Sequence, residues 1–269
     1  MVRAMSRYRL FLALGAAAVA AAIVIGEQKR PLRKRARKTV PRTARNLAMG
    51  ASCALVIAAA EEPLTKRIAR SNLEHGRGFA RHLPRPLRIL GGVAAMDYGF
   101  YLWHVATHKV PFLWRFHRIH HLDPDMDAST AMRFHAADML ISLPWQLVQV
   151  RLSGVSPKSL ALWRHFFNFS ILFHHANLRL PGKWDERLAR VLTTPKMHGI
   201  HHSNMQSERD SNWTSGLSFW DRLHGTFRQD VRQEDLVIGV GDPAAEEDET
   251  LENTLSAPFK PFPSSKRTM

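Results

Sequence analysis

Residues 104–121 read HVATHKVPFLWRFHRIHH, a stretch with five histidines in two groups spaced by three and four residues. The second spacing recurs in HGIHH at residues 198–202. Residues three and four apart share one face of an α-helix, so each group would present its imidazoles together. The eight histidines of these three groups are His104, His108, His117, His120, His121, His198, His201 and His202.

This pattern predicts a metal centre. With 15 histidines in 269 residues, a histidine followed by others at both +3 and +4 is expected about 0.05 times by chance, and the chain has two such cases. Neutral imidazole is the commonest metal ligand and suits iron, zinc, copper and nickel. Eight imidazoles exceed the four ligands of a structural zinc site, so we expect two neighbouring metal ions.

Asp97 precedes the first histidine group on the same helix face. Tyr101, His104 and His108 follow it at +4, +7 and +11. A buried acid in an apolar run needs a partner, and a carboxylate often accepts the second ring N–H of a ligand histidine. We therefore expect Asp97 to orient a ligand; a helix-capping or surface role is the alternative.

The basic excess points to a membrane. The net charge is +15, from 38 Lys and Arg against 23 Asp and Glu. Residues 8–26 are apolar except for Arg9 and would span about 28 Å as a helix, close to the hydrocarbon core of a bilayer. Residues 29–45 then carry nine Lys and Arg without an acid, which is the positive-inside pattern. We expect a retained anchor with a cytoplasmic basic segment, a cleaved signal peptide being the alternative, and no nucleic-acid partner.

Shorter apolar runs occupy residues 46–60, 89–103, 136–150 and 160–173. Each is below the length of about 18 residues expected of a membrane helix, but together they predict an all-α, integral membrane helical bundle. Two crossings and a hairpin would bring every histidine-rich segment to one cytoplasmic cap. The loop 61–88 weakens this topology, because it has seven Lys and Arg of its own.

We divide the chain into three parts: an anchor and basic segment (1–45), a membrane catalytic domain (46–228) and a mostly irregular tail (229–269). The tail carries acidic clusters and prolines, which are typical of irregular segments.

The ordered motifs resemble the fatty acid hydroxylase/sterol desaturase superfamily between about Asp97 and Thr226. DYGFYLWHVATH is similar to its first histidine box and LWRFHRIHHLD to its second. MRFHAAD, FHHANLRLP, TPKMHGIHHS and NWTSGLSFWDRLHGT are similar to its later conserved segments. The chain departs from the usual pattern at Val105, at Trp213 and Thr214, and at His224, and none of these departures removes a box histidine.

The resemblance implies a membrane-bound, di-iron, O₂-dependent enzyme that hydroxylates or desaturates a lipid, such as a fatty acyl chain or a sterol. It assigns the eight box histidines and His175 as iron ligands and makes His135 a further candidate. Asn177 is expected to support the ligands through hydrogen bonds, as Asp97 is, and no catalytic residue beyond the metal ligands is implied.

The electrons must come from outside the chain, because the sequence has no dinucleotide fingerprint, haem-attachment motif or iron–sulfur spacing. We expect an NAD(P)H-linked carrier, cytochrome b5-like or ferredoxin-like, as a separate partner. The expected location is a bacterial inner membrane with the active site facing the cytoplasm. A non-catalytic membrane metal-binding or transport protein is the alternative. A soluble zinc hydrolase would need a carboxylate base beside its histidine pair, and these boxes have none.

Overall fold

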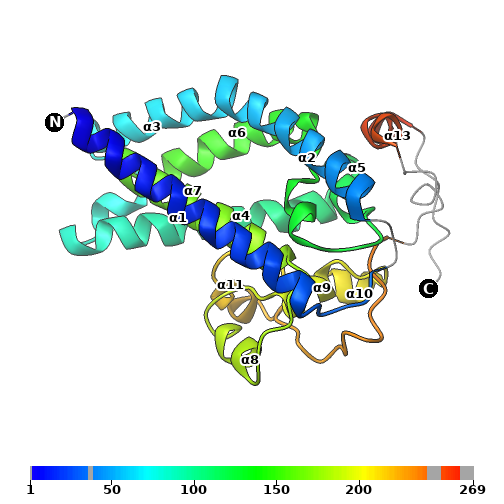
Figure 1. The fold of residues 1–269 in the computed structure, drawn as a ribbon. Helices are drawn as coiled ribbons and strands as arrows, with labels where there is room; N and C mark the ends of the chain where they lie inside the picture. The colour runs from blue at the N-terminus through cyan, green and yellow to red at the C-terminus, as the bar shows by residue number, and fades with distance from the viewer. Residues whose placement is uncertain (1, 36–38, 241–249, 261–269) are drawn as a thin grey trace.

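A computed structural model describes residues 2–35, 39–240 and 250–260, with side chains from residue 14 onward except Thr39. The described chain is all-helical, with isolated β-bridges as its only extended pairing. Five rods, drawn as long helices in Figure 1, make the bundle. They are α1 (Val2–Lys29), α2 (Thr39–Val56) continued by η1 (Ile57–Glu61) and α3 (Glu62–His75), α4 (Arg88–Lys109), α6 (Ala136–Ser153) and α7 (Pro157–His175).

Shorter elements gather near one end of these rods. They are α5 (Pro111–His121), η4 (Ala128–Met132), α8 (Trp184–Leu188), α9 (Pro195–His201), α10 (Gln206–Arg209), α11 (Phe219–Leu223), α13 (Leu251–Ser256) and η5 (Ala257–Phe259). In Figure 1 the labels of α5, α9 and α10 lie beside the end of α4. This is the end at which α4 and α7 finish and α6 begins.

The opposite end is closed by tight turns, with η2 (Phe79–His82) and η3 (Arg85–Leu87) between α3 and α4. Gly154 ends α6 with a φ of +70°. A Cβ on Gly78 would lie 2.4 Å from the Gly154 Cα, so only glycine allows the two turns to touch. A small apolar core of six buried side chains lies at this end: Ala69, Met96, Val150, Val155, Leu160 and Trp163.

The prediction that residues 61–88 form a loop is wrong in its first half. Glu61 and Glu62 do not end a helix, because η1 passes directly into α3, which continues to His75. The expected irregular tail contains α13 and η5, while residues 241–249 and 261–269 lie outside the described part of the chain.

Large apolar side chains face outward along the rods. Leu14, Val24, Leu55, Leu90 and Leu152 are examples, each between 39% and 73% exposed. Most buried side chains are polar or charged instead. An apolar exterior around a polar interior is typical of a surface that contacts lipid.

By length and hydropathy, one stretch of the described chain, Val40–His82, could cross a bilayer, with a mean hydropathy of 1.4 and 11% of its most apolar window buried. The predicted anchor, residues 8–26, lies within the continuous helix α1, but its side chains are described only from residue 14. The anchor and the number of crossings therefore stay predictions.

Candidate metal centre

Eight histidines converge at one end of the bundle as two sets of four. One set is His104, His108, His121 and His201, and the other is His120, His175, His198 and His202. Within each set the candidate ligand atoms all lie within 4.8 Å of one another. The two sets match the geometry expected of two metal sites. Seven of their members are box histidines, and the eighth is His175, which the resemblance implied; the remaining box histidine, His117, is in neither set.

The consecutive histidine pairs explain how the two sets lie side by side. His120 and His121 point into different sets, and so do His201 and His202. The rings of His121 and His202 stack across the boundary, with centroids 4.2 Å apart. Two neighbouring residues at a helix end therefore supply one candidate ligand to each set.

Four helices direct their C-terminal ends at this region. The histidines lie in the last two turns of α4, in the last turns of α5 and α7, and at the end of α9. A helix C-terminus carries about half a negative charge from its unsatisfied carbonyls, which favours a cation nearby. The fold therefore adds an electrostatic preference for cations to the imidazole cluster.

Backbone carbonyls fix the orientation of several rings. The Nδ1 atoms of His104 and His201 lie 2.6 Å from Trp213 O and 2.9 Å from Ser211 O. His175 Nδ1 lies 2.6 Å from Ile171 O. A carbonyl can only accept, so each Nδ1 must carry the proton and each Nε2 presents a lone pair.

The lone pairs of His104 and His201 face each other. His104 Nε2 and His201 Nε2 are 3.1 Å apart, and His175 Nε2 lies 3.1 Å from His198 Nε2 and 2.9 Å from His120 Nε2. No ring proton is left to bridge the first pair. Two nitrogens bound at right angles about 2.1 Å from one metal would be about 3 Å apart, so the spacing fits two ligands of a shared ion.

Further ring nitrogens are buried without a hydrogen-bond partner among the described residues. They are His108 Nε2, His117 Nε2, both nitrogens of His121, His174 Nε2, His198 Nδ1 and both nitrogens of His202. Buried polar atoms are almost always hydrogen-bonded, so such a concentration needs an explanation. Coordination of metal ions supplies one.

Burial favours the neutral form of four imidazoles of the two sets, those of His121, His198, His201 and His202. It lowers the pKa of His121, His198 and His202 well below 6.5, and neighbouring histidines lower it further. Burial also lowers the pKa of His201 to about 3. Neutral imidazole is the form that binds metals, so the site needs no loss of protons near neutral pH.

His117 lies at the centre but in neither set of four. Its ring centroid is 4.9 Å from that of His108 and 5.6 Å from that of His120. Its Nδ1 lies 3.7 Å from Asp138 Oδ2, so Nε2 remains to face a metal. Its role as a ligand stays a prediction.

His174 was missed from the sequence. It is fully buried, its Nδ1 lies 3.1 Å from Ser215 O, and its ring centroid is 4.0 Å from that of His198. Helical spacing does not indicate which ring of the adjacent His174 and His175 faces the histidine cluster. The motif FHHANLRLP contains both, and the pair itself was the available signal.

The structure does not bring His135 to the two sets. Its Nδ1 accepts the Ala137 N–H at 3.0 Å as the N-cap of α6, and its Nε2 lies 3.2 Å from Leu255 O. Both ring nitrogens are therefore engaged, and a metal would have to displace one of these hydrogen bonds. His224 lies at the surface, where its Nε2 is 3.2 Å from the Tyr98 hydroxyl.

The expectation that Asp97 accepts an N–H from a ligand histidine is wrong, because its hydrogen-bond partners are other residues. Asp97 Oδ2 accepts the Leu217 N–H and the Trp220 indole N–H, both at 2.9 Å. It therefore anchors the loop 211–218, whose carbonyls contact the rings of His104, His174 and His201. Asn177 likewise contacts no described histidine through its side chain; its amide pairs with the backbone of Arg33 at 2.8 and 2.9 Å.

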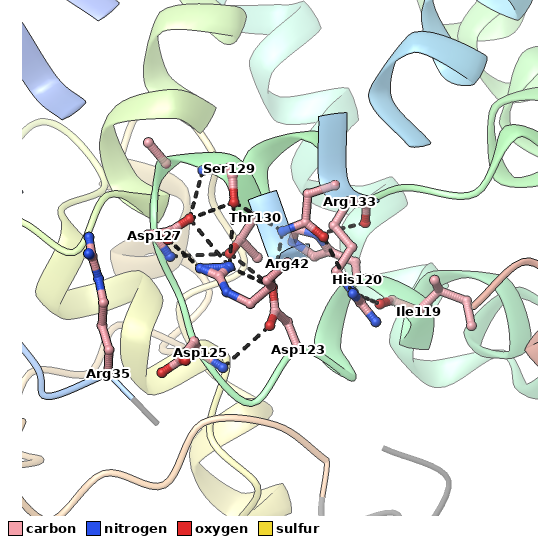
Figure 2. A network of polar contacts seen from close by, with 12 residues as sticks. Arg35, Arg42, Ile119, His120, Asp123, Asp125, Asp127, Ser129, Thr130 and Arg133 are labelled. Carbon is pink, nitrogen blue, oxygen red and sulfur yellow. Dashed lines mark hydrogen bonds and ion pairs between the residues drawn. The ribbon is translucent and has the colours of Figure 1, made fainter. Parts of the chain in front are cut away.

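A buried polar network supports His120 (Figure 2). Arg42 of α2 pairs with Asp127 and, at 3.1 Å, with Asp123. Arg133 donates from Nε to Ile119 O at 2.8 Å, and its own carbonyl lies 3.3 Å from His120 Nδ1. The network joins α2 to the segment after α5 and holds the carbonyl that orients a candidate ligand.

A cavity of about 830 Å³ opens onto the histidines. At one end its wall includes His104, His117, His120, His175 and His198. Mostly apolar side chains of α1, α2, η1, α4, α6 and α7 line the rest, together with the charged side chains of Glu61, Glu62 and Arg164. Its volume lies within the usual range for pockets that bury small organic ligands.

A sequence profile of the fatty acid hydroxylase family matches residues 89–226. Ornithine lipid hydroxylase OlsE of Rhizobium tropici is 27% identical over 195 residues, which are 72% of this chain and 55% of that protein. Human alkylglycerol monooxygenase is 28% identical over 149 residues, 55% of this chain and 32% of that protein.

Human cholesterol 25-hydroxylase is 29% identical over 144 residues, 52% of this chain and 51% of that protein. The matched region thus spans about half of the first and third of these relatives and about a third of the second. No solved structure matches the chain.

Proposed function

Because the chain belongs to the fatty acid hydroxylase family, we propose that it is a membrane-bound, O₂-dependent oxidoreductase that hydroxylates or desaturates a lipid. The two sets of four histidines next to a mostly apolar cavity are the observation that carries this proposal. The relatives named as an ornithine lipid hydroxylase, an alkylglycerol monooxygenase and a cholesterol 25-hydroxylase support lipid as the substrate class.

We assign one iron ion to each set. His104, His108, His121 and His201 would hold the first, and His120, His175, His198 and His202 the second, with His117 between them. When bound, the two irons would supply the redox chemistry with O₂ that an unactivated C–H bond requires.

The protein's own residues would orient the ligands and exclude water. The carbonyls of Ser211 and Trp213 hold His201 and His104 in one tautomer, so both present Nε2 to the metal. The cavity would admit a hydrocarbon chain from the bilayer and bring one of its carbons to the histidine end.

We propose a multi-pass topology with the histidine end facing the cytoplasm of a bacterial inner membrane. The basic segment from Lys29 lies at this end of α1, in agreement with the positive-inside rule. We keep the division into an anchor (1–45), a catalytic domain (46–228) and a tail (229–269). Electrons would reach the irons from NAD(P)H through a separate cytochrome b5-like or ferredoxin-like protein.

A non-catalytic membrane metal-binding or transport protein is disfavoured. Transport would need a polar path across the bilayer, whereas the cavity beside the histidines is mostly apolar.

Turnover by the purified, iron-loaded protein tests the proposal. The full chain would be incubated with a lipid extract, ¹⁸O₂, NADH and a reductase–cytochrome b5 or reductase–ferredoxin pair, and the lipids would be analysed by mass spectrometry. We expect one lipid class to gain one labelled oxygen atom or to lose two hydrogens. The H201A variant should give neither change. A folded, iron-loaded protein that alters no lipid with either carrier would contradict the proposal.

A further inference from the structure

The cavity has a charged cluster at the end far from the histidines. Arg164 of α7 donates from Nη2 to Glu61 Oε1 at 3.1 Å and to the Thr65 hydroxyl at 2.7 Å. The side chains of Arg164 and Glu61 are 20% and 14% exposed, and both line the cavity. Ionisable groups within a membrane bundle are costly and face cavities or one another, so this pair calls for a role.

An unusual backbone feature presents the cluster to the cavity. The π-helical turn Ile57–Glu61 interrupts the rod formed by α2 and α3, and the Glu62 N–H donates to Ile57 O. Pro63 follows and removes one N–H from the helix. Four residues of this segment, Ile57, Ala58, Glu61 and Glu62, line the cavity. Single π-turns occur frequently at functional sites.

Helix α7 gives the length between the two ends. Arg164 and His175 both line the cavity and lie eleven residues apart on one helix. At 1.5 Å per residue this separation is about 16 Å. An extended chain advances roughly 1.2 Å per bond, so this backbone separation corresponds to about 13 bonds of a hydrocarbon chain.

The charges of the cluster are paired. Arg164 is the one Lys or Arg among the described residues that line the cavity, and it lies beside two carboxylates. Glu61 pairs with it, and Glu62 pairs with Lys66 and lies 3.9 Å from the Arg164 guanidinium. An added charged group would enter a mostly apolar cavity without an opposite charge, at a high desolvation cost. A neutral group that accepts or donates hydrogen bonds would meet no such penalty.

We propose that Glu61 and Arg164, whose guanidinium is held by the Thr65 hydroxyl, bind the neutral polar group of an amphiphilic substrate, such as a hydroxyl, ester or amide. Its hydrocarbon fills the cavity, and the length of α7 between Arg164 and His175 determines which carbon meets the metals. The binding site stands on the cavity and the cluster, whereas the oxidation of that carbon rests on the proposed function.

Binding of chain-matched ligands tests the site without turnover. Full-length protein in detergent micelles, without an electron donor, would be titrated with radiolabelled 1-hexadecanol, hexadecane and hexadecanoate. The R164M variant removes the donor while retaining a long side chain. Each ligand partitions into the micelles equally with either protein, so comparing wild type with R164M cancels the effect of partition. R151M is the matched control, because Arg151 of α6 bonds to Asn72 Oδ1 at 2.8 Å and does not line the cavity.

The quantity compared is the ratio of hexadecanol affinity to hexadecane affinity. We expect this ratio to be at least about tenfold larger in wild type and in R151M than in R164M, as a hydrogen bond to a charged group implies. E61Q, which keeps the shape of the side chain, should lose part of this preference. Equal preference in wild type and R164M would overturn the proposal. Tighter binding of hexadecanoate than of hexadecanol would overturn the assignment to a neutral group.

Failure of the site and failure of the proposed function are distinguishable. A hexadecanol preference that depends on Arg164, found in a protein that oxidises no lipid, would support the binding site and contradict the proposed function. Lipid oxidation by a protein without any such preference would support the proposed function and contradict the binding site.

Discussion

Replacing Asp221 by asparagine should destabilise the protein and disturb the metal centre together. Asp221 is fully buried and accepts hydrogen bonds from the Trp213 N–H at 2.8 Å, the Thr214 N–H at 3.1 Å, the Thr214 hydroxyl and the Thr226 hydroxyl at 2.7 Å. The next carbonyl along this segment, Trp213 O, lies 2.6 Å from His104 Nδ1. The carboxylate therefore fixes the loop that orients a candidate ligand.

The magnitude follows from the hydrogen bonds. Asparagine keeps one acceptor oxygen and turns an NH₂ group toward two of the donors. Leaving two buried donors without an acceptor costs about 1–3 kcal/mol each. Burial raises the pKa of Asp221, so removing the charge returns part of this cost. We expect a net loss of about 3 kcal/mol, which corresponds to a fall in Tm of about 6–12 °C for a chain of this size.

Thermal unfolding in detergent, followed by tryptophan fluorescence, measures the loss. D230N is the matched control, because Asp230 is 70% exposed and pairs only with the nearby Arg228 at 2.7 Å among the described residues. Its Tm should stay within about 2 °C of wild type. D221N should also bind iron about 10–100-fold more weakly, as measured by chelator competition. A D221N protein with the Tm and iron affinity of wild type would refute the role given to this loop.

Three further predictions concern the histidines and the cavity. H117Q should lower iron affinity in chelator competition, whereas H135Q should not, because both ring nitrogens of His135 are already hydrogen-bonded; equal effects would contradict the distinction. In metal-free protein, burial holds the pKa of His198, His201 and His202 below 6.5. Below pH 6.5 the unfolded chain therefore binds more protons than the folded chain. The Tm should fall between pH 7 and pH 5, and it should fall less in H201Q. An unchanged Tm would count against neutral buried rings. S142F, which adds bulk at a buried residue of the cavity wall, should reduce lipid turnover at least about tenfold with iron content unchanged, and normal turnover would place the substrate elsewhere.

The sequence revealed the local chemistry of the site better than its support. Spacings of three and four residues place imidazoles on one helix face, so the boxes could be found without a structure. The division into two sets could not, because it depends on consecutive residues such as His201 and His202 pointing into different sets. His174 was missed for the same reason, since adjacency on a helix does not say which ring turns inward.

Long-range contacts were also beyond prediction. Asp97 bonds to Leu217 and Trp220, more than a hundred residues away, and nothing in its helical spacing distinguishes those partners from a histidine. The helix continues past Glu61, and that acid pairs with Arg164, which lies in a distant helix. Charged residues that end an apolar run in sequence can therefore lie inside the bundle.

Metal content tests the central claim most directly. The purified, folded full-length protein would be loaded with ferrous iron, freed of loosely bound metal and analysed by inductively coupled plasma mass spectrometry. We predict two iron atoms per chain in wild type and about one in H202A, which keeps the set of His104, His108, His121 and His201 intact. One iron atom or none in folded wild-type protein would contradict the account.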